Sequence, residues 1–408
     1  MDIRTITPHE LAAVRTLCFT AFEDDIDGTG NPQASAHQIL HTPLTRMHQN
    51  YLATWAAFDD SGNPIATVAH CTQTAHFDGS HVPLEAIGDV ASLPQAHGTG
   101  TVRRLFQEIL QLAYEQEIPF SYLYPFSDGY YARLGYSCCV KNHIWHLVLS
   151  QLPSFSFSGE CRPFFTGQDM ERDLEQIYNQ AVQPYNLSLI REQPEWNRQL
   201  KRLDPFRDSY FTYLYYDQNN VPTGYLSYQV HKASRRLECK QFFFVQSDAL
   251  QGMLAFLKGK QSYYHTVDIP LPCDVPLDLL LTEFHLNSPH NTCYTLEMHG
   301  MVRIVHLAAA FRAARFNGSG KFVFSVLDPL LEKNNGIFEL IYKDGCFVSL
   351  VSCEKVPCIQ LTIPLLARFL CAGVRESDLQ FLPSCPPQTV ELLKKVFPPK
   401  VTGIFDYF

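Results

Sequence analysis

Residues 86–112, AIGDVASLPQAHGTGTVRRLFQEILQL, contain an apolar run, a glycine turn and an amphipathic segment, in that order. The apolar run ends at Pro94, which predicts a short strand before it. From residue 102 to residue 112 apolar side chains recur at helical spacing, so we expect a helix with one face packed on a sheet. Gly98 and Gly100 precede this helix and allow a tight turn. The stretch therefore predicts a strand, a turn and a helix.

The predicted turn lies at a helix N-terminus and carries no acidic side chain. Free backbone N–H groups and the positive end of the helix dipole suit an anion such as a pyrophosphate at this place. Arg103 and Arg104 add positive charge nearby. A left-handed turn without a ligand would have the same sequence, so the turn alone leaves both interpretations open.

A second motif follows at residues 119–139. A predicted strand at 119–124 leads into PFSDGYYARLGYSCC, which contains YARLGY starting at Tyr131. A strand, a glycine turn and a helix followed by Y-x-x-x-G-Y resemble the GNAT N-acetyltransferases, which use acetyl-CoA. More narrowly, VASLP before the turn, YARLGY after it and an aromatic last residue resemble the Eis (enhanced intracellular survival) family over nearly the whole chain.

The resemblance implies an α+β protein of mixed helices and strands, with two tandem GNAT-type domains followed by a sterol-carrier-protein-like domain. We expect a catalytic GNAT domain at residues 1–150, a second, degenerate GNAT domain at 151–285 and the last domain at 286–408. A strand at 143–149 is expected to close the first domain, and one at 301–305 to begin the last. For the last domain we expect a role in packing and in closing the pocket rather than in lipid transport.

The second copy lacks the glycine turn. Val245 leads through Gln246 and Ser247 to Asp248, directly at the start of the next predicted helix. The Asp248 carboxylate would repel a phosphate group. We therefore expect this copy to be structural.

Composition excludes several classes of protein. The chain has 408 residues, of which 46% are hydrophobic, and a net charge of −9, which does not favour nucleic acid as a partner. No apolar run approaches the ~18 residues that span a bilayer, and the first residues do not resemble a signal peptide, so we expect a cytoplasmic protein without membrane contact. The 13 cysteines include no C-x-x-C pair, which favours reduced thiols and no metal site.

The resemblance also assigns residues to the cofactor. The strand edge would bind the thioester oxygen and the pantetheine of acetyl-CoA through backbone N–H groups, and the turn with the start of the helix would hold the pyrophosphate. The strand residues are Val90, Ala91 and Ser92, and the others are His97, Gly98, Thr99, Gly100, Thr101, Val102, Arg103 and, after the second strand, Ser127. Turns in the family usually carry several arginines, whereas this one reads HGTG. Backbone N–H contacts could replace those side chains, or acetyl-CoA could bind more weakly.

By the same resemblance, Tyr131 is the general acid and the C-terminal carboxylate of Phe408 the base. A phenol, with a pKa of about 10, can share a proton with a leaving thiolate of pKa ~8.5. Both residues could instead simply pack in the interior. Glu23 and Asp24 could attract an aminated substrate, although a solvated acidic loop is the simpler interpretation.

The resemblance implies an acetyl-CoA-dependent N-acetyltransferase acting on amines of a polycationic small molecule, either aminoglycoside-like or a polyamine. The resemblance implies a homo-oligomer such as a hexamer. Two alternatives remain open: a protein-lysine acetyltransferase, and a non-catalytic protein that binds an apolar ligand on the same fold.

Overall fold

Two structural units make up the described part of the chain. The computed structural model describes residues 1–22, 53–165, 168–203, 210–281, 292–375, 378 and 387–406. The first unit comprises Met1–Cys139, Gly300–Lys400 and Phe405–Phe408, and the second Val140–His299 and Val401–Ile404. All cysteines in the described ranges are free thiols, and no helix there is both long and apolar enough to cross a membrane.

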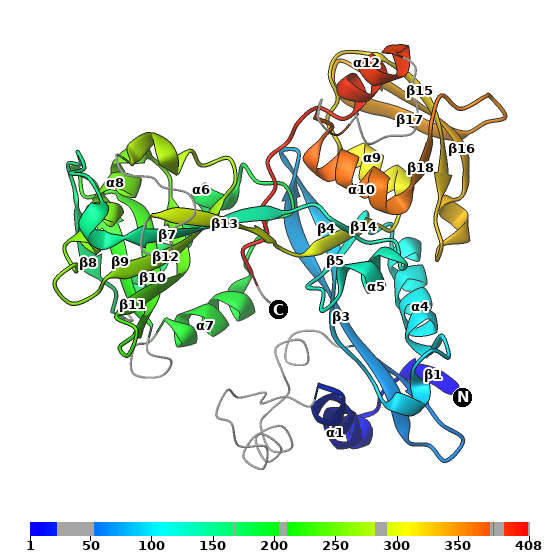
Figure 1. Cartoon of the computed structure of the whole chain (residues 1–408). Helices are drawn as coiled ribbons and strands as arrows, with labels where there is room; N and C mark the ends of the chain where they lie inside the picture. The colour runs from blue at the N-terminus through cyan, green and yellow to red at the C-terminus, as the bar shows by residue number, and fades with distance from the viewer. Residues whose placement is uncertain are drawn as a thin grey trace. The chain divides into compact units, whose positions relative to one another are not determined.

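The first unit contains a seven-stranded sheet in the order β1-β2-β3-β4-β5-β14-β6, and Figure 1 shows its long central strands β3 and β4. The strands are β1 (Asp2–Thr5), β2 (Ala53–Phe58), β3 (Pro64–Phe77), β4 (Ser80–Ser92), β5 (Phe120–Leu123), β14 (Met301–Ile304) and β6 (Ser137–Cys138). The two strands predicted around the glycine turn are thus β4 and β5.

Strands β4 and β5 run parallel, and β5 is much the shorter. Their pairing extends from Leu84 opposite Phe120 to Ile87 opposite Leu123. Proline has no N–H to donate to a ladder, and Pro125 follows β5 closely, so this strand cannot continue. Residues 88–92 of β4 therefore extend beyond their last partner on β5.

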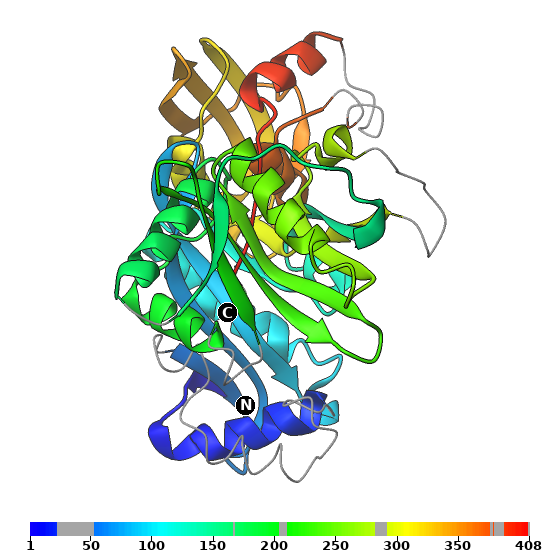
Figure 2. The same ribbon diagram turned by 90° about the vertical axis from the view of Figure 1, so that its left-hand side faces the viewer.

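Two helices cover opposite faces of this sheet (Figures 1 and 2). Helix α4 (Thr101–Glu115) buries its apolar face in a core that includes Ala57 of β2. On the other side, helix α1 (Leu11–Phe22) packs Val14 against Ala56. Ala56 and Ala57 are neighbours in one strand and so point to opposite faces. The predicted amphipathic helix, α4, is confirmed.

The later part of the first unit adds a four-stranded sheet in the order β17-β16-β15-β18. Its elements are α9 (Leu307–Ala313), β15 (Gly320–Leu327), β16 (Gly336–Lys343), β17 (Cys346–Ser352), β18 (Gln360–Thr362), α10 (Ile363–Ala372) and α12 (Pro387–Val396). Aromatic rings fill its interior: Phe311 packs against Phe324 at a centroid distance of 5.4 Å, and Phe322 against Phe397 at 5.8 Å. The predicted mixture of helices and strands is confirmed here.

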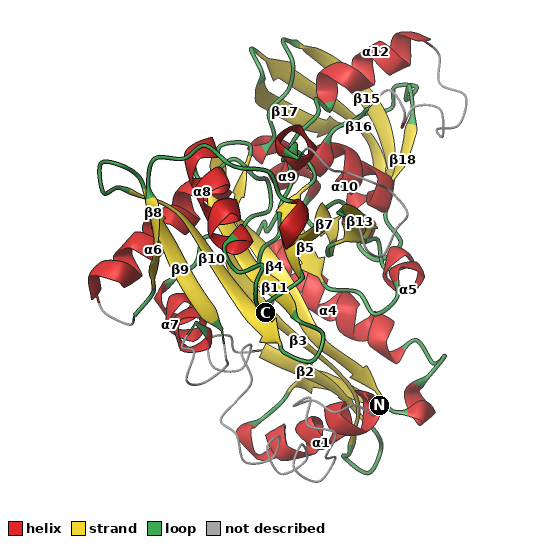
Figure 3. Cartoon of the chain, turned by 60° about the vertical axis from the view of Figure 1, so that its left-hand side comes forward, coloured by secondary structure: helices red, strands yellow, loops and turns green. Residues whose placement is uncertain are grey.

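The second unit contains a second seven-stranded sheet, in the order β13-β7-β12-β11-β10-β9-β8. Figure 3 shows β8 to β11 side by side. The strands are β13 (Cys293–Met298), β7 (Lys141–Val148), β12 (Thr266–Pro272), β11 (Arg236–Phe244), β10 (Pro222–His231), β9 (Phe211–Tyr216) and β8 (Glu160–Pro163). Three helices accompany them: α6 (Gln168–Val182), α7 (Gln193–Arg202) and α8 (Ser247–Lys258).

Two strands pair differently from the expectation. The strand expected to close the first domain is β7, but it pairs with β12 and β13 of the second unit, where Trp145 and Leu147 enter the core. The strand expected to begin the last domain is β14, but it lies between β5 and β6, with Val302 opposite both Tyr122 and Ser137. Because β14 occupies the position next to β5, β7 takes its partners from the second sheet.

Candidate active site

The glycine turn has the backbone conformation that the sequence predicts. Gly98 and Gly100 have φ angles of 72° and 79°, and a Cβ atom at either position would meet nothing within 4 Å. Backbone conformation, rather than space, therefore favours glycine here. The hydroxyl of Thr99 donates to the carbonyl O of Ala96 at 2.8 Å and lies 2.7 Å from that of Thr101, which fixes the turn. As the N-cap of α4, Gly100 has no side chain to accept from the first-turn N–H groups. The N–H of Thr101 donates to Oγ1 of Thr99 at 3.4 Å, whereas those of Val102 and Arg103 come before any intrahelical acceptor and can serve a ligand.

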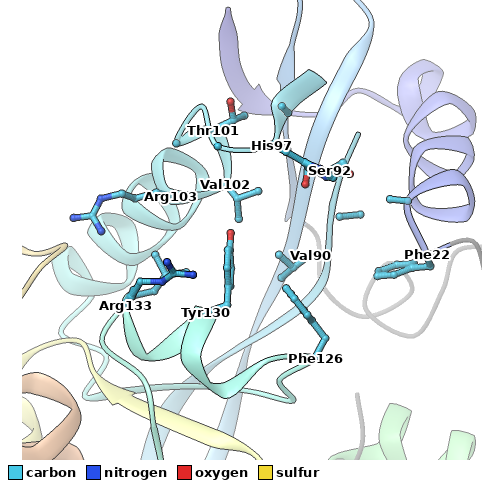
Figure 4. A pocket seen from close by; sticks show the side chains of 16 residues that line it. Phe22, Val90, Ser92, His97, Thr101, Val102, Arg103, Phe126, Tyr130 and Arg133 are labelled. Carbon is cyan, nitrogen blue, oxygen red and sulfur yellow. Dashed lines mark hydrogen bonds between the residues drawn. The ribbon is translucent and has the colours of Figure 1, made fainter. Parts of the chain in front are cut away.

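A cavity of about 740 Å³ adjoins this turn. Figure 4 shows its walls: the end of β4, the turn with the start of α4, the end of α1, and the short helix α5 (Asp128–Ala132) with the turn that follows it. The lining residues are Ala21, Phe22, Val90, Ala91, Ser92, Ala96, His97, Gly98, Gly100, Thr101, Val102, Arg103, Phe126, Tyr130, Arg133 and Leu134. All the predicted cofactor residues except Thr99 and Ser127 thus line one cavity.

The end of β4 forms one wall of the cavity. Val90, Ala91 and Ser92 belong to the part of the strand beyond the last pair with β5. Asp89, just before them, has a φ of 48°, and the register with β3 shifts at this point, as in a β-bulge. An extended ligand could form strand-like hydrogen bonds with this edge, because β5 does not.

The described part of the wall carries basic side chains. Among the lining residues that the structure describes, none is Asp or Glu, whereas His97, Arg103 and Arg133 are basic. The guanidinium of Arg103 donates to the carbonyl O of Pro329, and Nε2 of His97 lies 3.2 Å from the carbonyl O of Ser92. This wall suits a ligand with anionic groups and an extended apolar part.

The structure does not place Tyr131 on the cavity wall. Its side chain is only 2% exposed and belongs to the core, with ring centroids 6.1 Å from Phe106 and 6.3 Å from Tyr136. Burial raises the pKa of Tyr131. Its neighbour Tyr130 lines the cavity instead, with the two ring centroids 5.2 Å apart. Consecutive residues of a helix point about 100° apart, so one tyrosine faces the cavity and the other the core.

The remaining predicted site residues either do not line the cavity or lie outside the described residues. Ser127 is the N-cap residue of α5. Glu23, Asp24 and Phe408 lie outside the described residues. Near the C-terminus, the hydroxyl of Tyr124, just after β5, donates to the carbonyl O of Asp406 at 2.7 Å. The sequence analysis missed the lining residues Ala21, Phe22, Ala96, Phe126, Tyr130, Arg133 and Leu134, although four of them lie within PFSDGYYARLGYSCC.

Comparisons with known proteins agree with this geometry. Two models described as acetyltransferase (GNAT) domains match residues 2–139 and 187–304, and a sterol carrier protein domain matches residues 307–402. The chain is an acetyltransferase with two GNAT domains. Acetyltransferases of this domain class use acetyl-CoA, which fits a wall with a left-handed glycine turn, basic side chains and an open strand edge. The predicted order of two GNAT domains and a sterol-carrier-like domain is confirmed.

Solved structures share the fold over the full length. A probable N-acyltransferase from Enterococcus faecalis is 17% identical, with a TM-score of 0.81 and 100% and 99% of the two chains covered. A GCN5-related N-acetyltransferase from Anabaena variabilis is 20% identical, with a TM-score of 0.81 and both chains fully covered. Eis1 from Mycobacterium abscessus is 18% identical, with a TM-score of 0.78 and both chains fully covered. A search among curated proteins finds no match.

At the N-terminus of α8, where the second GNAT domain would have its glycine turn, an acidic side chain is present instead. The Asp248 carboxylate accepts from the backbone N–H of Ser158 at 2.9 Å and from the hydroxyl of Tyr215 at 2.6 Å. A side chain of this acetyltransferase thus already supplies the negative charge that a phosphate would bring to α8. Among the residues that the structure describes, no group of His, Cys, Asp and Glu side chains could hold a metal ion.

Proposed function

We propose that this acetyltransferase is an Eis-type N-acetyltransferase that transfers the acetyl group of acetyl-CoA to amines of a polycationic small molecule, either aminoglycoside-like or a polyamine. The cavity of the first GNAT domain carries the proposal, because it combines the glycine turn, the open edge of β4 and basic side chains. The full-length likeness to Eis1 supports the Eis-type assignment.

Each part of the cavity has a role in this proposal. The first-turn N–H groups of α4 bind the pyrophosphate, and the edge at Val90, Ala91 and Ser92 holds the pantetheine and orients the thioester. The carboxylates of Glu23 and Asp24 are proposed to attract a cationic acceptor. Binding both reactants in one place replaces a bimolecular encounter by a reaction within one complex.

The reaction requires two proton transfers. The neutral amine attacks the thioester carbon, the C–S bond breaks, and the departing thiolate takes a proton, for which Tyr131 is the proposed source. A phenol is protonated at neutral pH, as a general acid must be. Burial raises the pKa of Tyr131 and so makes its phenol a weaker acid toward the departing thiolate. The carboxylate of Phe408 is the proposed acceptor of the proton that the amine loses.

The test measures release of CoA thiol from acetyl-CoA with aminoglycosides, polyamines and lysine peptides as acceptors. We expect turnover with the first two groups, and a loss of about 10²–10⁴-fold in kcat for Tyr131→Phe. Tyr114→Phe is the matched control, because it removes a hydroxyl from a tyrosine of α4 that does not line the cavity. Turnover with lysine peptides alone would favour a protein-lysine acetyltransferase, and no turnover with any amine would contradict the proposal.

The assembly is a separate proposal. The Eis resemblance supports a homo-oligomer, which sedimentation velocity would test. A monomer at micromolar concentration would contradict it without affecting the proposed reaction.

A further inference from the structure

We propose that Arg133 binds a phosphate group of acetyl-CoA and supplies the charge that the glycine turn lacks. The inference rests on the proposed function, since it concerns the donor of that reaction. Residues 97–100 read HGTG and contain no lysine or arginine, so the turn itself offers a phosphate mainly backbone N–H groups. Phosphate binding by N–H groups is stronger when a cation shares the charge.

The partners of the three basic lining residues distinguish Arg133 from the others. Arg103 donates to the carbonyl O of Pro329, and the ring of His97 lies within hydrogen-bonding distance of Ser92. Within the described part of the chain, the guanidinium of Arg133 has no hydrogen-bonding or ion-pair partner. Its N–H donors therefore remain available to a ligand in the cavity that it lines.

The position of Arg133 is fixed by its neighbours. It is the C-cap residue of α5, and the carbonyl O of the next residue, Leu134, accepts from Nη1 of Arg303 at 2.6 Å. Arg303 is fully buried, so this backbone is held from the interior. The ring of Tyr130 supports the guanidinium at 5.9 Å from its centroid. Figure 4 shows the guanidinium of Arg133 beside Tyr130 and that of Arg103 directed away from them.

Guanidinium suits this task because its planar fork can donate two parallel hydrogen bonds to one phosphate. Arg133 lies at the C-terminal end of α5, on a different wall of the cavity from the α4 turn. A ligand with more than one phosphate group could therefore be bound by both walls. Acetyl-CoA carries a pyrophosphate and a 3′-phosphate, and both have the chemistry that Arg133 would recognise.

The test is the Kd of acetyl-CoA by calorimetry for the wild type, Arg133→Gln and Arg133→Lys. Losing a charge-assisted, partly exposed contact is expected to raise the Kd about tenfold in Arg133→Gln, with partial recovery in Arg133→Lys. Arg104→Gln is the matched control, because Arg104 lies on α4 but does not line the cavity. The melting temperature should change little in all three variants.

Acetyl-3′-dephospho-CoA, which keeps the pyrophosphate but lacks the 3′-phosphate, shows which of the two groups Arg133 binds. If Arg133 binds the 3′-phosphate, Arg133→Gln should not weaken binding of this analogue. If it binds the pyrophosphate, Arg133→Gln should weaken binding of acetyl-CoA and of the analogue equally. An Arg133→Gln Kd for acetyl-CoA within twofold of the wild type, or an equal loss in Arg104→Gln, would overturn the assignment while leaving the proposed function intact. If the wild type does not bind acetyl-CoA, the proposed function fails, and this inference fails with it.

Discussion

Replacing Arg303 by methionine should destabilise the first unit strongly. Arg303 and Asp328 are fully buried, with Nη2 and Oδ2 2.7 Å apart. Arg303 also donates to the carbonyl O of Leu134 at 2.6 Å, and so holds the backbone just after α5, next to Arg133. Arg303→Met removes the positive charge but keeps an unbranched apolar side chain at the site.

The contacts that remain determine the size of the effect. Removing one partner of a buried ion pair costs about 3–5 kcal/mol, because the other charge stays buried without compensation. Asp328 keeps three donors: the N–H groups of Leu330 at 2.9 Å and Leu331 at 3.1 Å, and the amide of Asn334 at 2.9 Å. These should limit the loss to this range. For a unit of this size, roughly 2–4 °C per kcal/mol gives a fall in melting temperature of about 6–20 °C.

Thermal unfolding followed by circular dichroism measures the effect. Arg312→Met is the matched control, because Arg312 forms a 3.0 Å ion pair with Glu117 whose side chains are 57% and 59% exposed. We expect this control to cost less than about 1 kcal/mol. The double variant Arg303→Met, Asp328→Asn should lose less free energy of unfolding than the two single variants together, since no unpaired charge remains. A fall in melting temperature for Arg303→Met no larger than for Arg312→Met would refute the reasoning.

Three further predictions concern the turn, the C-terminal segment and pH. Gly100→Ala places a side chain at a φ of 79°, which costs about 1–2 kcal/mol and should raise the Kd of acetyl-CoA in calorimetry, whereas Gly129→Ala in α5, where φ is not positive, should not. Tyr124→Phe removes the hydrogen bond to the C-terminal segment and should speed release of its residues by carboxypeptidase; an unchanged rate would contradict this. The hydrogen bond from Arg4 lowers the pKa of Glu10 to about 2, so its contribution to stability is present above the ordinary pKa of 4.5 and is lost as the pH falls toward 2. The melting temperatures of wild type and Glu10→Gln should thus differ at pH 7 and converge near pH 2; a constant difference would contradict the assignment.

Local signals in the sequence predicted the turn and the helix that adjoin the cavity. The glycine turn and α4 follow from short-range pattern: two glycines at positive φ and apolar side chains at helical spacing. The absence of a glycine turn before α8 was equally visible, because Asp248 and its neighbours are adjacent in the chain.

Long-range pairing was not predictable in the same way. The strands β7 and β14 were expected from their apolar residues, but their partners depend on which strand takes the place next to β5. The pattern of a single strand does not contain that information. Similarly, the YARLGY motif did not reveal that Tyr130 faces the cavity while Tyr131 enters the core, because this depends on how α5 is rotated against α4.

The number of acetyl-CoA molecules bound per chain tests the central claim most directly. The first GNAT domain has an open cavity at its glycine turn, whereas at the α8 N-terminus the Asp248 carboxylate takes the place of an anion. Isothermal titration calorimetry of the full chain should therefore give one acetyl-CoA per chain, with the affinity reduced by Gly100→Ala. Two equivalent sites, or no binding, would contradict the account.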